Sequence, residues 1–213
     1  MSYPSYTRNE RLADGAVHIV GFALALGAVV WLLSRMPQEV GMGQWTALAV
    51  YSAALLIMLG ASGAYHILAD TIARPILRRL DHAAIYVKIA GTFTPLAVLL
   101  GTGFGYVTLG IVWVLALVGA ALKLMTGRGR MHTAFWPYLA LGWMGVILFV
   151  PLIGLLPRFS LGLILAGGLL YSAGIAFYAW EKLRYSNAIW HGFVLVASGC
   201  FFGGIATGIQ LVP

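Results

Sequence analysis

Long runs of apolar residues, separated by short polar breaks, cover almost the whole chain. A helix needs ~20 apolar residues to cross the hydrocarbon core of a membrane. Seven runs are suited to this, and they predict helices over residues 16–35, 45–68, 82–100, 105–126, 132–155, 160–180 and 188–211. Because the connections are short, the pattern predicts a single all-α domain over residues 1–213, an integral membrane bundle of seven transmembrane helices.

The composition and the placement of charge support a membrane protein and predict its orientation. Hydrophobic residues make up 61% of the chain and charged residues only 9%. If the helices alternate in direction, Arg35 and Arg158 lie on one side, and the other basic residues of the breaks lie on the N-terminal side: Arg8, Arg11, Arg74, Arg78, Arg79, Lys123, Arg128, Arg130, Lys182 and Arg184. The positive-inside rule then predicts a cytoplasmic N-terminus and an outside C-terminus. The net charge of +7 therefore reports topology and indicates no nucleic-acid partner.

In this topology all five histidines fall at the cytoplasmic side, at the level of Asp14 and Asp81: His18, His66, His82, His132 and His191. Helix ends tolerate polar residues, so one interpretation is ordinary interfacial polarity. That interpretation is favoured for His132, which stands beside Arg128 and Arg130.

Spacings on the second and seventh predicted helices favour a metal site instead. Ser62 and His66 are four residues apart and share a helical stripe, as do Asn187 and His191. Three convergent protein ligands plus water are typical of a catalytic zinc site, although the sequence has no HExxH pair.

The third predicted helix carries Asp81 and, seven residues later on the same face, Lys88. An ionisable side chain inside a membrane span costs about 3 kcal/mol on insertion scales, so it usually faces a partner in the bundle. Lys88 can pair with Asp81, reach toward the interface, or act as a base.

The residues that carry these spacings resemble a known family. The matching runs are Ser62-Gly-Ala-Tyr-His66, Leu80-Asp81-His82-Ala-Ala-Ile-Tyr86, Ile89 to Pro95, Gly167-Gly168-Leu-Leu-Tyr171 and Ala188-Ile-Trp190-His191-Gly-Phe-Val194. They resemble hemolysin III proteins, the bacterial branch of the progestin and adiponectin receptor family, over Glu10 to about Ile205. The resemblance implies seven helices with a cytoplasmic N-terminus in the bacterial inner membrane.

The resemblance also implies a zinc ion held by His66, with Ser62 behind it, and by His191, while Asp81 hydrogen-bonds the metal-bound water. The family's other helix-seven histidine is replaced by Asn187, whose amide oxygen is a weaker zinc ligand than imidazole. The family's N-terminal motif appears as Glu10, Asp14 and His18, with Asp14 where Asn is usual. His18 or Asp81 could complete the coordination.

Two functions remain open, and a third is less favoured. The first is a zinc-dependent hydrolase of a ceramide-type lipid amide or ester, with His66, His191 and Asp81 at the metal and Asp81 and Ser62 in catalytic roles. Its supporting residues are Asn187, His18, Asp14, His82 and Lys88. The alternative is a non-catalytic regulator of membrane lipid homeostasis or fluidity. A pore is less favoured because the polar residues gather at one end. The expected partners are membrane lipids, and the sequence does not identify any protein partners.

Overall fold

The structure, a computed structural model, describes residues 6–36, 40–126, 135–180 and 182–211. In these ranges it contains helices and no strand: α1 (Arg8–Ser34), α2 (Met42–Ile67), α3 (Arg74–Leu100), α4 (Gly103–Met125), α5 (Trp136–Trp143), α6 (Gly145–Leu152), α7 (Arg158–Ala179) and α8 (Ser186–Leu211). Six of them are long and apolar enough to cross a membrane, and α5 with α6 forms a shorter apolar stretch. The all-α, multi-pass class predicted from the apolar runs is confirmed.

Two helices, α1 and α3, begin about two turns earlier than the apolar runs predicted. α1 begins at Arg8 because Thr7 and Glu10 form a reciprocal capping box, in which each side chain bonds the other residue's backbone N–H. α3 begins at Arg74, with a proline in its first turn. Asp14 and Asp81 therefore lie on helices, where the backbone fixes the direction of their side chains.

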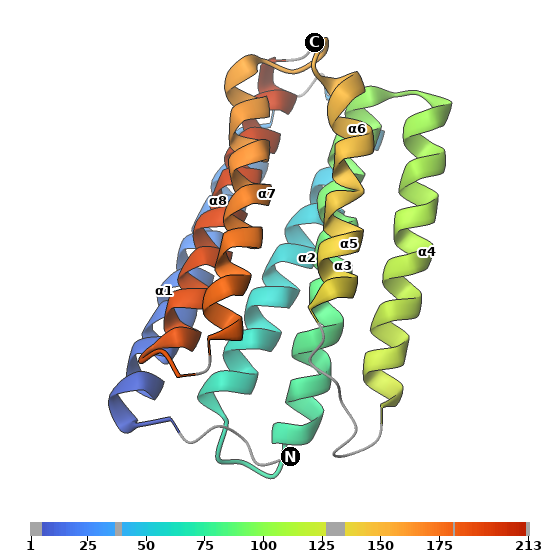
Figure 1. The fold of residues 1–213 in the computed structure, drawn as a ribbon. Helices are drawn as coiled ribbons and strands as arrows, with labels where there is room; N and C mark the ends of the chain where they lie inside the picture. The colour runs from blue at the N-terminus through green and yellow to red at the C-terminus, as the bar shows by residue number, and fades with distance from the viewer. Residues whose placement is uncertain (1–5, 37–39, 127–134, 181, 212–213) are drawn as a thin grey trace.

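α3 is the central helix of the bundle. In its most apolar window 72% of the residues are buried, compared with 22% for α4, which contacts α3 along one face. α2 lies on the other side of α3, α1 joins α2 to α8, and α7 packs on α8 (Figure 1). α1 begins at the end of the bundle opposite to the one where α8 ends (Figure 1), as an odd number of passes requires.

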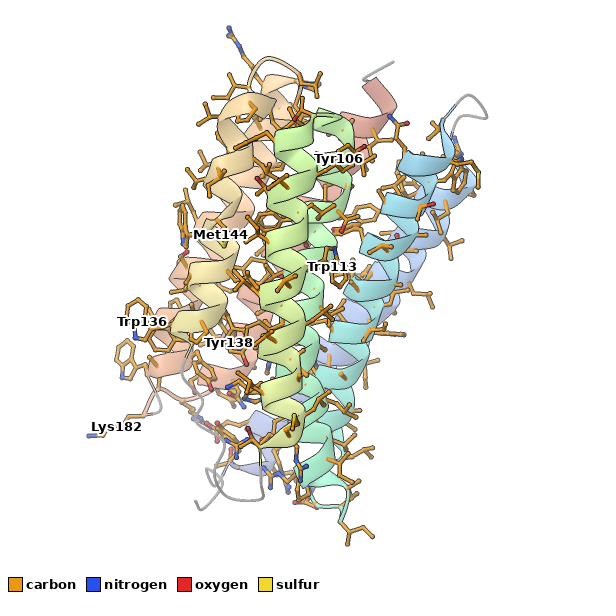
Figure 2. All side chains as sticks on the ribbon, turned by 90° about the vertical axis from the view of Figure 1, so that its right-hand side faces the viewer. Tyr106, Trp113, Trp136, Tyr138, Met144 and Lys182 are labelled. Atoms are coloured by element: carbon orange, nitrogen blue, oxygen red, sulfur yellow. The ribbon has the colours of Figure 1, made fainter. Side chains whose placement is uncertain are left out.

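The helix predicted over residues 132–155 corresponds to a shorter apolar helical stretch described over Trp136–Leu152. The described part of this stretch is divided into α5 and α6 at Met144, which Figure 2 labels at their junction. Gly142 and Gly145 flank Met144, and glycine weakens a helix because its backbone has the most freedom to lose. Pro151 lies inside α6 and is not the point of interruption. His132, Arg128 and Arg130 lie outside the described residues.

Small residues let α3 approach its neighbours closely. A Cβ added at Gly91 would lie 2.6 Å from the Cβ of Ala54 on α2. One turn farther along α3, Trp113 of α4, labelled in Figure 2, donates its indole N–H to Thr94 over 3.1 Å. Side-chain packing and interhelical hydrogen bonds, the two forces available in lipid, thus both hold α3 in place.

We expect Gly91→Leu to lower the melting temperature in detergent micelles, because overpacking a well-filled contact costs about 1–3 kcal/mol. Gly110→Leu is the matched control, since a Cβ at Gly110 on α4 would meet no atom within 4 Å. Equal melting temperatures for the two variants would contradict the close α2–α3 contact.

Candidate metal centre

Four potential metal ligands from three helices converge near the start of α1. Asp14 and His18 come from α1, His66 from α2 and His191 from α8. One ligand atom from each lies within 4.8 Å of the others. Asp14 and His191 are only 6% and 8% exposed, so the cluster is an interior feature of the bundle.

Asp14 is the hub of this cluster. Its Oδ1 accepts from His191 Nδ1 over 2.6 Å, and its Oδ2 lies 2.9 Å from His66 Nδ1. His18, four residues along the same face of α1, places Nε2 at 3.8 Å from Asp14 Oδ1. The His18 ring also stacks on that of His66, with the centroids 5.0 Å apart. A single carboxylate therefore links α1 to both α2 and α8.

The chemistry of these residues fits a zinc ion. His18 Nε2 is buried and has no hydrogen-bond partner among the described residues, which is uncommon for a polar atom in a protein interior. It faces a carboxylate and two further imidazoles, and histidine nitrogens with a carboxylate oxygen are a donor set that zinc accepts. All four side chains of the cluster are therefore of types that bind zinc.

Asp81 and Ser62 border the cluster. Asp81 is buried on α3, and its Oδ2 lies 3.3 Å from His82 Nδ1. The ring of Tyr65 connects this pair to the cluster, with its centroid 6.5 Å from that of His82 and 4.7 Å from that of His66. Ser62, one turn before His66, lines a pocket together with His18 and His191. The structure thus brings both predicted catalytic residues beside the ligands, while Asp14 and His18 hold more central places than the sequence suggested.

His82 and Lys88 lie apart from the four-residue cluster. His82 Nδ1 lies 2.9 Å from the carbonyl oxygen of Arg78, and Tyr138, labelled in Figure 2, donates to the His82 carbonyl. Lys88 points toward Tyr171 and Phe201. In the described parts of the chain Asp81 is paired with His82 and not with Lys88.

Two pockets open onto the cluster. One is lined by polar residues of the loops and of the start of α1: Tyr6, Glu10, Arg11, Asp14, His66, Tyr185 and Asn187, with Ala69 and Ala188. The other is mostly apolar, and lies between α1, α2 and α8: Val17, His18, Gly21, Met58, Leu59, Ser62, His191, Val194 and Leu195. A polar approach and an apolar approach therefore meet at the histidines.

Comparison with known proteins agrees with the resemblance found in the sequence. The family model described as "Haemolysin-III related" matches residues 6–202. The hemolysin-3 homolog of Bacillus subtilis is 34% identical over 199 residues, which cover 92% of this chain and 93% of that protein. Hemolysin-3 of Bacillus cereus is 33% identical over 194 residues, covering 91% and 89%. The chain belongs to the hemolysin III family.

Within the hemolysin III fold, the polar start of α1 is fastened to two loops. Glu10 accepts from the backbone N–H of Tyr185 over 3.1 Å, at the turn before α8. Arg11 donates to Asp70, after α2, over 2.5 Å. Both contacts lie one turn before Asp14, so they fix the position of α1 where its carboxylate meets the imidazoles.

At position 187 the resemblance implies a histidine, and this chain has an asparagine. Asn187 lines the polar pocket with Asp14 and His66. The spacing of Asp14 and His18, four residues apart in front of an apolar run, was the sequence signal for their shared position. That signal did not reveal that Asp14 would contact both His66 and His191, because the contact depends on how α1 is rotated against α2 and α8.

We expect Asp14→Ala to reduce the stability of the metal-free protein by about 3 kcal/mol, because it leaves two buried imidazoles without their acceptor. Thermal or denaturant unfolding in micelles, after treatment with a chelator, measures the loss. Asp70→Ala is the control: its side chain is 77% exposed, and an exposed ion pair contributes less than about 1 kcal/mol. Equal losses would show that Asp14 is not the hub.

Proposed function

We propose that this hemolysin III protein is a zinc-dependent hydrolase of the inner membrane that cleaves an amide or ester bond of a lipid. The observation that carries the proposal is the buried convergence of Asp14, His18, His66 and His191 between a polar pocket and an apolar one. A hydrolase for lipids needs both, since water must reach the bond from one side and the acyl chain must lie on the other.

Asp14, His18, His66 and His191 would hold the zinc ion. When bound, zinc supplies Lewis acidity for a carbonyl oxygen and makes water acidic enough to attack near neutral pH. A carboxylate that accepts a hydrogen bond from an imidazole also fixes the orientation and tautomer of the ring, as carboxylates behind zinc-bound histidines do. Asp14 can therefore serve the centre as a ligand or as the orienting partner of His66 and His191.

Asp81 would accept a proton from the attacking water. It is buried outside the four-residue group, and the contact with His82 holds its side chain in place. Carboxylates positioned near the reacting bond in this way contribute ~10²–10⁴-fold in rate. Ser62, which faces the apolar pocket, can donate its O–H to the carbonyl oxygen of a lipid.

The lining of the apolar pocket indicates the chemical class of the substrate. Met58, Leu59, Val194 and Leu195 form the apolar part of this lining, which suits a hydrocarbon chain, while His18, Ser62 and His191 form the polar part. A lipid whose acyl carbonyl lies at the histidines would place the first methylenes of its chain there. A ceramide-type amide or an ester meets this requirement.

We expect purified protein to contain about one zinc per chain, and His66→Ala or His191→Ala to lower zinc affinity by at least tenfold, because each removes a direct donor. His82→Ala is the control and should keep its zinc, since His82 bonds the Arg78 carbonyl outside the cluster. Elemental analysis of protein in micelles decides the matter. Wild-type protein that holds no zinc after reconstitution would overturn the metal centre.

We expect Asp81→Asn to lower the release of fatty acid from a ceramide-type lipid in proteoliposomes by ~10²-fold or more while zinc content stays unchanged, because it removes the proton acceptor. Leu80→Ala, the neighbouring exposed residue, is the control and should retain its turnover. Undiminished turnover in Asp81→Asn would refute this role for Asp81.

A second candidate is a non-catalytic regulator of membrane lipid homeostasis. It is favoured by the bonds from Asp14 to both His66 and His191, which join three helices as a structural staple. Stability that depends on Asp14, together with zinc binding and no turnover of ceramide-type amides or lipid esters, would establish this function in place of hydrolysis.

A further inference from the structure

A second buried polar group lies deep in the bundle, away from the metal centre. Lys88 stands near the middle of α3 and is only 5% exposed. It follows Asp81 by seven residues on the same face of the helix, which places it about 10 Å farther along the axis. No carboxylate in the described residues forms an ion pair with it.

The surroundings of Lys88 are aromatic. Its Nζ lies 4.4 Å from the centre of the Tyr171 ring on α7 and 5.0 Å from that of Phe201 on α8. Both distances fall within the range of cation–π contacts, whose geometry suits a charged ammonium group. Aromatic faces attract the cation but do not neutralise its charge.

Hydroxyl groups on the neighbouring helices offer hydrogen-bond donors in the same bundle. Tyr171 Oη and Ser198 Oγ are 2.6 Å apart, and either can be the donor, so Ser198 can donate and leave the Tyr171 O–H for another acceptor. Tyr51 of α2 is fully buried, its ring centroid lies 6.4 Å from that of Phe202 on α8, and its hydroxyl has no partner among the described residues. The hydroxyl of the adjacent Ser52 is also buried and unpartnered there.

These groups share one property, which is that they complement negative charge. A buried ammonium group needs a counter-charge, and an O–H group without an acceptor needs one too. Lys88 and Ser198 contact Tyr171, and α2 contributes buried hydroxyls to the same bundle interior. The described residues contribute no acid that pairs with Lys88. A metal cation would be repelled by Lys88, so this site differs in kind from the Asp14 cluster.

We propose that Lys88, Tyr51 and Tyr171 form a buried site for a monovalent anion, either a halide or the carboxylate of an amphiphile inside the bundle. Lys88 supplies the charge, and the two tyrosine hydroxyls supply hydrogen bonds that select an acceptor. The site goes beyond the proposed hydrolase and does not depend on it, because no ligand of the metal centre takes part.

The test uses the full-length protein in an uncharged detergent, with unfolding followed by intrinsic fluorescence. Bromide is titrated against gluconate, which is too large and hydrophilic for a buried site, at constant ionic strength. Oleate is titrated in parallel against oleyl alcohol, which has the same chain without the carboxylate. At an anion concentration ten times the Kd, wild-type protein should melt on the order of 4 °C higher.

Lys88→Met should abolish the saturable shift, because methionine keeps an unbranched chain of similar length and removes the charge. Lys123→Met, near the cytoplasmic end of α4, is the matched control and should keep the shift. Tyr51→Phe preserves the fold and the lysine and should weaken anion binding about tenfold by removing one donor to a charged acceptor. It keeps the test decisive if Lys88→Met fails to fold.

The bromide and oleate titrations distinguish the two possible sources of the anion. A shift with bromide alone identifies a free halide, and a shift with oleate but not oleyl alcohol identifies an amphiphile's carboxylate. The absence of a saturable shift with either anion, or an equal shift in Lys88→Met or Tyr51→Phe, would overturn the site. Zinc content should be the same in all these variants, so a failure of the metal centre remains distinguishable from a failure of this site.

Discussion

The bond between Asp14 and two imidazoles is the interaction on which the arrangement of α1, α2 and α8 depends. Inside a bilayer, polar groups find no water, so each must be satisfied by another part of the protein. Asp14 meets this requirement for His66 and His191 together. The contacts of Glu10 and Arg11 one turn earlier hold the same end of α1, so the hub and its supports form one continuous polar structure.

The bundle divides its polar groups by the sign of their charge. Acidic residues and histidines occupy the end where α1 begins, a composition suited to a cation. Lys88 and the tyrosine hydroxyls occupy the middle of the span, a composition suited to an anion. α3 carries a member of each group, Asp81 and Lys88, on one face, so the central helix sets the distance between them.

The length of the apolar runs was sufficient to predict the membrane helices, because hydrocarbon thickness imposes that length directly. It could not predict where α1 begins, since the capping box of Thr7 and Glu10 extends that helix through polar residues. Nor did it reveal the interruption at Met144, where local backbone preference acts inside a continuous apolar run. The predicted topology placed His66 and His191 at the same level of the membrane. Their contact with Asp14 depends on helix rotation, which no spacing within one helix records.

The contact of Asp14 with two histidines also concerns Asn187, which stands where the resemblance implies a histidine. An imidazole lost from α8 would leave a zinc centre with a neutral, weaker donor. This chain carries a carboxylate at position 14, where the resemblance implies a neutral amide, and the structure places it against His66 and His191. A carboxylate brings negative charge that imidazole lacks, so it would hold a divalent cation firmly while reducing the net charge of the site. A zinc ion bound in this cluster would therefore receive from Asp14 of α1 the donor that the resemblance implies for position 187 of α8.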